Sequence, residues 1–417
     1  MDKEIMSKCN ARYQKALRSN KQYALVNMNV KKFRYMNYAH GRIAANQILC
    51  DVEKTIRSFL KEDECIVRKD ADDFIMLVTY TSKKDFEKIW LVNLVDVLFD
   101  IDNTLVHHNI YTSFGIVFME SKEMDFEEAF EKAQFCRLMD ESYDRRVFSY
   151  EIYRQSVYDE YMHSCYLEEY TAMAREKGMY QVYIQPKIDL KTREIVGGEA
   201  LLRLFDHGKA IPVSEFLPIL NKNGYIRMVD LYVFETVVKE LKERDTQGKQ
   251  NVRISFNVSN SFFNDEYFIR DYSDILERVD IDTKFLEIEF MESICTNEDK
   301  MKEYIQEFHE MGFQCSLDDF GNGFSNFNLL KDSKLDVVKI DRCFFTDEMS
   351  DEDKEILKTI MHLIKMVNME VVAEGVERKE DIEFLSTIGC DTVQGFYFYK
   401  PMPMKDFFAL LDEKNHS

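Results

Sequence analysis

Two adjacent aspartates, Asp318 and Asp319, stand in the stretch CSLDDFGNGFSN, after an apolar run and before a Gly-x-Gly turn. Like charges side by side repel each other, so we expect a cation between or beyond them. Adjacent carboxylates can each reach a different ion, and their oxygen atoms suit Mg²⁺ or Mn²⁺. The pair therefore predicts a two-metal site, although two aspartates before a glycine can also form an ordinary turn.

Polar residues recur near the carboxyl ends of seven successive strand-like runs in the second half of the chain. In a β/α barrel those ends meet at one face, which is where such barrels carry their active sites. The carboxylates crowded there would raise one another's pKa values unless cations were bound. No histidine or cysteine stands among them, so the ligand types favour Mg²⁺ or Mn²⁺ over zinc. The residues are Glu199, Arg203, Asn257, Glu289, Asp318, Asp319, Lys339, Asp341, Glu374 and Gln394.

The chemistry that this ligand set predicts is the cleavage of a phosphoester. Two metal ions roughly 3.5 to 4 Å apart stabilise both the attacking and the leaving oxygen of such a reaction. Lys339 could orient the attacking water, and Arg203 could grip a phosphate oxygen. Each residue alone would be an ordinary surface or loop residue, but the recurrence at equivalent places on buried strand-like runs favours a shared site.

Eight β-rich runs supply these strand ends, and amphipathic helical stretches separate most of them. They are QVYIQPKI, IVGGEALLRL, VRISFNVS, FLEIEF, FQCSLDDF, DVVKID, EVVAEGV and TVQGFYFY. This alternation predicts an α/β fold, a (β/α)8 TIM-like barrel over residues 165–417, preceded by a helical linker over residues 141–164. A doubly wound open sheet would show the same alternation.

The first half predicts an α+β domain over residues 21–140, with helices packed on a central antiparallel sheet. Its strand-like runs are YALVNMNV, ECIVRK, DFIMLVTY and TSFGIVFM, with helical patterns between and after them. Residues 1–20 are expected to form an N-terminal helical segment.

The composition limits the partners of the chain. Its 417 residues carry a net charge of −21, which argues against binding DNA, RNA or anionic lipid. A small phosphate-bearing substrate stays open where metal ions reverse the sign locally. No apolar run reaches the roughly 18 residues of a membrane span and no signal peptide is recognisable, so we expect a cytoplasmic protein without membrane insertion. Nine cysteines without a CxxC pair are expected to stay reduced.

The motif GGEALLRL resembles the signature of EAL domains, the cyclic-di-GMP phosphodiesterases. The likeness extends over residues 165–412 and includes YIQPKIDL, FNVS, LEIEFMES, DDFGNGFSN, VVKID, VVAEGVE and VQGFYFYKPM. The resemblance implies hydrolysis of one phosphodiester bond of cyclic-di-GMP to linear pGpG, with two Mg²⁺ or Mn²⁺ ions, by a homodimer.

The resemblance also implies how the strand-end residues divide the work of catalysis. Lys339 would hold the nucleophilic water, Gln394 would lie close by, and Glu199 would serve catalysis as a metal ligand. No ligand position of the family is lost. The implied ligands of the two ions are Glu199, Asn257, Glu289, Asp318, Asp319 and Glu374.

Other positions match residues that the family uses around the substrate. Gln185, Arg203 and Asp341 are the implied substrate-binding residues. Glu292 would brace the loop DFGNGFSN, which in the family links metal binding to dimerisation, and Glu377 would support the ligands. The departures from the family pattern spare the ligands and concern the loop and its surroundings: they are Asn221, Met291, Asn322 and Phe324.

The first half resembles the GGDEF diguanylate cyclase domain in a degenerate form. The signature loop corresponds to DADDF, where Asp70 and Ala71 replace the glycines that let the chain approach GTP. The metal-binding aspartate of the first strand corresponds to Asn29. Of the guanine-binding pair, Asn37 is kept, but Asn46 replaces the second member. The inhibitory RxxD site falls on KEDE and is absent. We therefore predict that this domain makes no cyclic-di-GMP.

Several functions stay open beside these expectations. The degenerate domain could be a structural or dimerising module, a GTP-sensing domain that uses Asn37 and Asp73, or a docking surface for another protein. For the EAL-like half, the alternative to hydrolysis is a receptor or scaffold that binds cyclic-di-GMP or a protein without turnover. A different metal-dependent barrel enzyme, such as an enolase-like one, fits the GGEALLRL context poorly.

Overall fold

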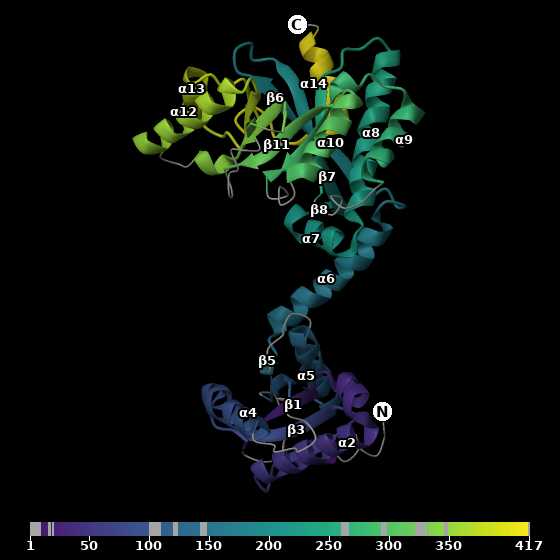
Figure 1. Ribbon diagram of the computed structural model, residues 1–417, viewed down its shortest axis with the longest axis vertical. Coiled ribbons are helices and arrows are strands. Elements are labelled where there is room, and N and C mark those ends of the chain that lie inside the picture. Colours follow the sequence, from purple (N-terminus) through teal and green to yellow (C-terminus); the bar gives the residue numbers. More distant parts are fainter. Residues whose placement is uncertain are drawn as a thin grey trace. The chain divides into compact units, whose positions relative to one another are not determined.

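The computed structural model of the chain divides into two compact units, Met1–Met162 and His163–Ser417 (Figure 1). It describes residues 10–15, 18, 21–99, 110–119, 124–141, 148–259, 267–292, 298–321, 330–331, 333–345 and 349–415. Among these residues, no helix is both long and apolar enough to cross a membrane.

The first unit is built on a five-stranded sheet with the order β2-β3-β1-β4-β5. The central strand β1 (Gln22–Val30) pairs antiparallel with β3 (Asp73–Tyr80) and with β4 (Thr112–Phe118). Strand β2 (Cys65–Arg68) forms an antiparallel hairpin with β3, and the segment DADDF runs from the turn between them into the first two residues of β3. Strand β5 (Phe148–Ile152) pairs parallel with β4 at the edge.

Helices cover both faces of this sheet because successive side chains of β1 point to opposite sides. Val26 and its alternate neighbours pack in one apolar cluster with α2 (Phe33–Phe59) and α4 (Val92–Phe99). Leu25 packs in a second cluster with α5 (Phe126–Glu141). The short helix α3 (Lys83–Asp85) and the π-helix Phe86–Leu91 lead into α4.

The expected helical linker over residues 141–164 is wrong in part, because β5 lies within it. Phe148, Tyr150 and Ile152 alternate with polar residues, which is the pattern of a strand with one apolar face. Their side chains pack against the cluster that also holds α2 and α4. Helix α6 (Gln155–Ala174) begins only after this strand. Because the neighbouring sequence is charged and rich in tyrosine, the sequence pattern did not reveal the five-residue strand β5.

The second unit is a closed barrel, as the alternation of strands and helices predicted. Strand β6 closes it by pairing with both β7 and β14, while β8 (Lys209–Ile211) and β15 (Met402–Pro403) add short antiparallel edges. The barrel strands are β6 (Tyr180–Asp189), β7 (Ile195–Asp206), β9 (Arg253–Val258), β10 (Leu286–Met291), β11 (Gln314–Phe320), β12 (Val337–Ile340), β13 (Glu370–Ala373) and β14 (Thr392–Val393).

One strand departs from a regular (β/α)8 barrel. The barrel strands β7, β9, β10, β11, β12, β13 and β14 run parallel to one another, but β6 is antiparallel to both of its barrel neighbours, β7 and β14. Strand β6 turns directly into β7 without a helix, because residues 190–194 form a tight connection between them. As a result Gln185, in the middle of β6, lies opposite Glu199 on β7 rather than at a strand end.

Helices surround the barrel with apolar stripes. On α8 the valines Val229, Val233 and Val237 recur every fourth residue and are buried, which is the pattern of a helix packed along one face. Helix α12 begins with a capping box between Ser350 and Asp353. The helices after α6 are α7 (Val213–Asn223), α8 (Ile226–Thr246), α9 (Phe268–Val279), α10 (Glu298–Glu310), α12 (Asp351–Met366), α13 (Lys379–Thr387) and α14 (Met404–Asn415).

Candidate active site at the carboxyl ends of the barrel strands

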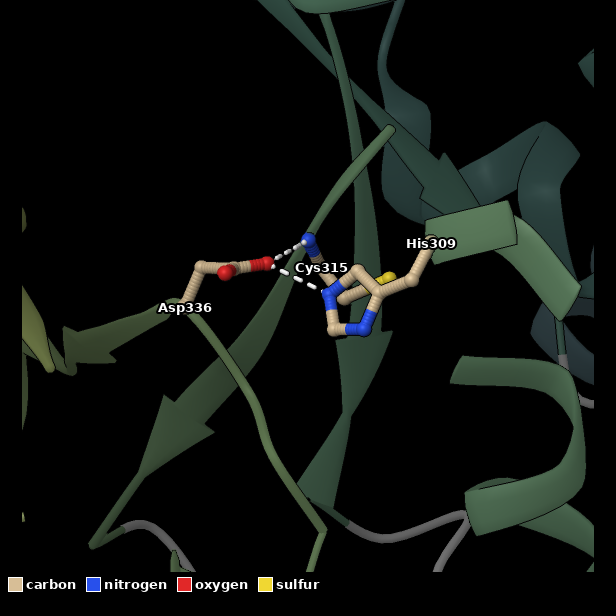
Figure 2. A group of neighbouring side chains, drawn as sticks. All are labelled: His309, Cys315 and Asp336. Carbon is tan, nitrogen blue, oxygen red and sulfur yellow. Dashed lines mark hydrogen bonds and ion pairs between the residues drawn. The ribbon is translucent and has the colours of Figure 1, made fainter. Parts of the chain in front are cut away.

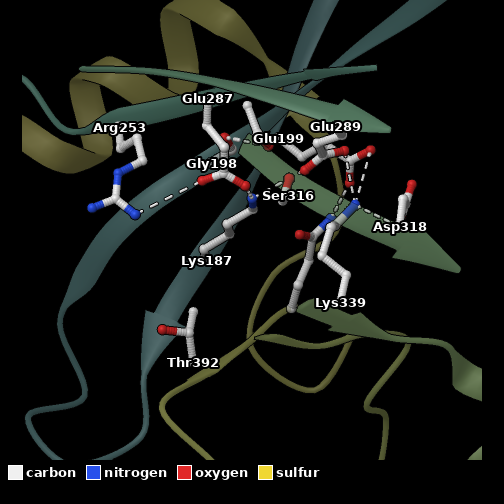
Figure 3. Close-up of polar contacts among 12 residues, drawn as sticks. Lys187, Gly198, Glu199, Arg253, Glu287, Glu289, Ser316, Asp318, Lys339 and Thr392 are labelled. Carbon is white, nitrogen blue, oxygen red and sulfur yellow. Dashed lines mark hydrogen bonds and ion pairs between the residues drawn. The ribbon is translucent and has the colours of Figure 1, made fainter. Parts of the chain in front are cut away.

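A buried lysine on β12 lies at the centre of the predicted carboxylates. Lys339 is 1% exposed, and its Nζ is 2.7 Å from Glu374 Oε1, 2.8 Å from Glu289 Oε2 and 2.9 Å from Asp318 Oδ1. Glu199 Oε1 follows at 3.9 Å. Figure 3 shows Lys339 pointing toward Glu289 and Asp318. Because the five residues come from β7, β10, β11, β12 and the end of β13, the barrel itself brings them together.

Two amides hold the Glu199 carboxylate, and a third amide accepts a hydrogen bond from one of them. The side chain of Asn257 donates to Glu199 Oε1 at 2.7 Å, and that of Gln394 donates to Glu199 Oε2 at 2.5 Å. Gln394 also donates to Gln185 Oε1 at 3.2 Å, and Gln185 donates to the carbonyl of Tyr399 at 3.2 Å. Both oxygens of Glu199 are therefore held by residues that the sequence placed in the same site.

The two adjacent aspartates sit on a break in strand pairing. The register of β11 against β12 shifts between Leu317 and Phe320. Asp319 has a backbone φ of 59°, which residues other than glycine seldom adopt. The Asp319 amide donates to Asp318 Oδ1 at 2.9 Å. One oxygen from each of Asp318, Asp319 and Glu374 lies within 4.8 Å of the other two. This bulge aims consecutive carboxylates into one small volume, where hard cations find their preferred oxygen ligands.

Burial and charge act differently on the individual carboxyl groups. Burial raises the pKa of Glu199 and raises that of Glu374 well above its ordinary value. Burial alone would also raise the pKa of Glu289, but the ion pairs with Lys339 and Lys187 outweigh it and lower that pKa to about 2. Burial, Asp318 and Asp341 raise the pKa of Asp319 to about 6. The site thus holds more negative charge than its lysines balance.

A cavity of about 650 Å³ opens beside the aspartate pair. Asn257, Asp318 and Asp319 are among its lining residues, together with apolar side chains of β7, α7, α8 and β9 and with the polar side chains of Asn221, Asp230 and Ser259. Arg203 is on its wall, donates to the carbonyl of Leu202 at 2.7 Å and stacks on the ring of Tyr183 at 5.7 Å. The predicted phosphate-binding arginine therefore borders both the carboxylates and an apolar space.

The remaining predicted residues have separate positions. Asp341 follows β12 and accepts from the amide of Cys343 at 2.8 Å, which caps a short 3₁₀ helix. Glu292 accepts from the amide of Gly321, at the start of the predicted loop, at 3.0 Å. Asn322 and Phe324 lie outside the described residues. Glu377 is exposed and takes no part in the contacts given above.

The comparisons with known proteins identify the family at this point. Residues 169–401 match the model of the EAL domain, and residues 4–137 match that of the diguanylate cyclase GGDEF domain. The chain belongs to the EAL domain family. A GGDEF domain precedes the EAL domain, in the order that the sequence predicted.

Among curated relatives of this EAL protein is the cyclic di-GMP phosphodiesterase PdeR of Escherichia coli, 26% identical over 93% of this chain and 58% of its own. The bifunctional diguanylate cyclase/cyclic di-GMP phosphodiesterase MucR of Pseudomonas aeruginosa is 27% identical over 95% and 58%. The signaling protein YkoW of Bacillus subtilis is 26% identical over 93% and 49%. The chain thus spans about half the length of the curated relatives it matches.

Solved structures resemble the EAL domain as well. The MucR phosphodiesterase in complex with c-di-GMP is 29% identical, with a TM-score of 0.55 over 58% of this chain and 99% of that one. An EAL domain protein from Listeria monocytogenes is 28% identical, with a TM-score of 0.52 over 57% and 94%.

The sequence analysis missed three charged residues of this EAL domain, which are Lys187, Glu287 and Asp230. Lys187, on β6, lies 3.2 Å from Glu287 and 3.1 Å from Glu289, and these carboxylates raise its pKa although burial alone would lower it. Asp230, on α8, accepts from the hydroxyl of Ser259 at 2.7 Å and lines the cavity. The available signal was a charge inside an otherwise apolar pattern, in QPKI, LEIEF and MVDLY.

A second polar cluster lies at the opposite ends of the strands, where β11 and β12 begin (Figure 2). His309, Cys315 and Asp336 could hold a metal ion by type. However, Asp336 Oδ2 already accepts from the Cys315 amide at 2.8 Å and pairs with His309 Nε2 at 2.8 Å. Burial also raises the pKa of the Cys315 thiol. We interpret this cluster as a tie that joins the end of α10 to two neighbouring strands.

Proposed function

We propose that the EAL domain hydrolyses one phosphodiester bond of cyclic-di-GMP to give linear pGpG, with two Mg²⁺ or Mn²⁺ ions. The observation that carries this proposal is the convergence of four carboxylates on Lys339 beside a cavity bordered by Arg203. The cyclic di-GMP phosphodiesterases among the relatives supply the substrate. Hydrolysis needs groups that balance charge on a phosphoryl oxygen, and this face of the barrel offers them.

The donor set fits two divalent ions. Glu199, Asn257, Glu289, Asp318, Asp319 and Glu374 would hold them. Within the described residues two ammonium groups, Lys339 and Lys187, form ion pairs with members of this group. With all five carboxylates ionised, as metal ligands must be, three negative charges stay unbalanced. One divalent ion would leave the site negative, whereas two would make it slightly positive and suited to an anionic phosphodiester. When bound, such ions supply Lewis-acid stabilisation of the charge that develops on the phosphoryl group.

The side chains of the domain would orient the reactants. Lys339 would hold the attacking water and keep a positive charge beside the phosphoryl group, because neighbouring carboxylates raise its pKa well above the ordinary value despite its burial. Gln394 keeps Glu199 in place by its hydrogen bond. Arg203 would bind a phosphate oxygen, and Gln185 and Asp341 would line the substrate groove. Glu292 would hold the loop next to the aspartate pair, and Glu377 would act from outside the cluster.

A receptor without turnover is the second candidate, and one observation favours it. Lys339 already pairs with three carboxylates at 2.7 to 2.9 Å, so it could neutralise part of the site without any metal ion. Such a domain would bind cyclic-di-GMP or a partner protein and leave the phosphodiester intact. The complete ligand set speaks for the enzyme.

The deciding experiment measures pGpG by chromatography after purified protein meets cyclic-di-GMP with Mg²⁺ or Mn²⁺. Wild type should produce pGpG, and Glu199→Ala should lose at least about a hundredfold of the rate, since it removes a ligand whose two oxygens are both held in place. Glu383→Ala, at an exposed position on α13 to which no role is assigned, is the matched control and should keep most activity. Binding of cyclic-di-GMP by wild type without pGpG would make the domain a receptor.

For the first unit we propose a GGDEF domain that makes no cyclic-di-GMP. Asn29 donates to Asp73 Oδ1 at 3.1 Å, so an amide stands where the family has a metal-binding aspartate. Asp70 and Ala71 occupy the hairpin loop, where Arg68 binds the Ala71 carbonyl at 2.8 Å. The unit would then be a structural or dimerising module, a GTP sensor or a docking surface for another protein. We also propose a homodimer for the whole chain.

GTP sensing can be tested on the full chain. Cutting at residue 140 would remove β4 and leave β5 without its partner, so a point variant is preferable. If the domain senses GTP through the kept guanine-binding position, GTP should change the rate of pGpG formation by wild type but not by Asn37→Ala. An equal response of the two proteins, or none in wild type, would rule out sensing at this site and leave the structural and docking roles.

A further inference from the structure

A row of buried charges runs through the barrel toward the candidate metal site (Figure 3). Lys187 Nζ lies 3.2 Å from Glu287 Oε1 and 3.1 Å from Glu289 Oε1. All three residues are at most 5% exposed. Glu289 Oε2 in turn lies 2.8 Å from Lys339. Each carboxylate oxygen of Glu289 therefore pairs with a different lysine, and one of the two, Lys339, takes part in the proposed reaction.

The row begins at the opposite ends of the strands. Arg253, the first residue of β9, lies 3.8 Å from Glu287 Oε2 and 3.2 Å from Glu370 Oε2. Glu287 thus has a second cation of its own, whereas Lys187 is the cation that pairs with Oε1 of Glu289, which also has a hydrogen bond with Ser255. Gly197 lies opposite Lys187 in the strand pair, and a Cβ there would come within 2.8 Å of the Arg253 carbonyl. The first glycine of GGEALLRL therefore helps to keep the row closely packed.

We propose that Lys187 is a positioning residue that holds Glu289 by one oxygen and leaves the other to face the metal ions. This inference rests on the proposed function, because it gives Glu289 the role of a ligand. A buried carboxylate without a fixed partner can rotate and costs free energy to desolvate, whereas one held by a buried cation keeps a single orientation. Lys339 cannot do this alone, since a cation entering the site would compete with it for Oε2.

The consequence is a defined loss of metal affinity when Lys187 is removed. Residues that hydrogen-bond to a metal ligand and orient it, without contacting the metal themselves, typically contribute tenfold or more to metal affinity. Removing Lys187 alone would also leave the carboxylates of Glu287 and Glu289 facing each other without a cation between them. Their repulsion could destabilise the fold, and a loss of folded protein could then be mistaken for a loss of metal affinity. The double variant Lys187→Met/Glu287→Gln removes one charge of each sign and keeps the interior filled. Glu287→Gln alone is the matched control, because it leaves the contact of Lys187 with Glu289 intact.

The experiment measures Mn²⁺ binding to full-length protein without substrate, by electron paramagnetic resonance of the free ion. The double variant should bind Mn²⁺ roughly tenfold more weakly than wild type, and Glu287→Gln should bind it nearly as wild type does. Circular dichroism verifies folding of each variant. Should the methionine variant fail to fold, Lys187→Gln/Glu287→Gln keeps a hydrogen-bond donor of similar length without the charge and should show an intermediate loss.

The outcomes separate this inference from the proposed function. Equal Mn²⁺ affinity of a folded double variant and wild type overturns the role of Lys187 alone. Equal weakening by Glu287→Gln and the double variant also overturns it, because the effect would then belong to the buried pair. Mn²⁺ binding that depends on Lys187 in a protein that forms no pGpG supports the inference and overturns the hydrolase. A wild type that binds no Mn²⁺ overturns both.

Discussion

Asp230 is a buried carboxyl group on the wall of the cavity, and its burial outweighs two hydrogen bonds from Ser259 and raises its pKa to about 7. A carboxyl group in the unfolded chain titrates near pH 4, so between roughly pH 4 and 7 the folded state binds the extra proton. The contribution of Asp230 to stability should therefore fall as the pH rises through this window. Asp230→Asn removes that contribution.

The prediction is that Asp230→Asn gains thermal stability relative to wild type between pH 5 and pH 8. The comparison with wild type cancels the titration of Glu199, Glu374 and Asp319, which both proteins share. Thermal unfolding followed by circular dichroism at both pH values measures it. A difference between the two proteins that does not change with pH would contradict the assigned pKa.

At the scale of single residues, strand-end positions could be predicted because buried strands tolerate polar groups only where a function or a partner requires them. Glu289 and Lys339 are such positions, and the structure brings them within 2.8 Å. Lys187 escaped this reasoning because it lies near the carboxyl end of the antiparallel strand β6, and that end is at the opposite side of the barrel from the carboxyl ends of the other strands. Asp230 escaped it because a helix presents one polar residue on its buried face without any break in its periodicity.

At the scale of elements, the tie made by Asp336 connects the end of α10 with the beginnings of β11 and β12 (Figure 2). Asp336→Ala leaves the Cys315 amide and the His309 ring without this acceptor, so the free energy of unfolding should fall by about 1–3 kcal/mol. Urea denaturation measures the change. Asp351→Ala, at an exposed position in the first turn of α12, is the control. An Asp336→Ala variant as stable as wild type would show that the tie adds no stability.

Because Asp336 lies at the amino ends of the strands, its loss should spare the chemistry at the carboxyl ends. Its variant, while folded, should therefore form pGpG at nearly the rate of wild type, if the EAL domain is the proposed hydrolase. A rate that falls by much more than the folded fraction would show that the tie also shapes the site.

The elements differ in how far periodicity predicts them. Long helices such as α8 repeat their apolar residues over many turns, so their sequence pattern predicts them well. Parallel strands can be predicted because an amphipathic helical pattern lies on either side of each of them in the sequence. Strand β5 has five residues, and its alternation of Phe148, Tyr150 and Ile152 is too short to stand out from a charged surrounding. The direction of β6 is set by the short connection over residues 190–194, which is a property of a turn rather than of a hydrophobic pattern.

At the scale of the whole molecule, charge and apolar surface act in opposite directions on self-association. Each chain carries a net charge of −21, so two copies repel each other. Helix α12 nevertheless exposes an apolar stripe, in which Ile356 is 53%, Leu363 is 40% and Met366 is 66% exposed. Residues seven apart, such as Ile356 and Leu363, lie on the same side of a helix. This stripe is the surface that we expect a second copy to cover in the proposed homodimer.

The balance of the two effects predicts a dimer that strengthens with salt. The screening length falls from about 30 Å at 0.01 M to about 8 Å at 0.15 M salt, so repulsion between the copies weakens while burial of the stripe is retained. Light scattering after size exclusion should show more dimer at the higher salt. Leu363→Glu with Met366→Glu should give monomer at both concentrations, whereas Lys358→Glu, on the same helix, should not. A double variant that still dimerises would place the contact on another surface, and a wild type that is monomeric throughout would end the homodimer proposal.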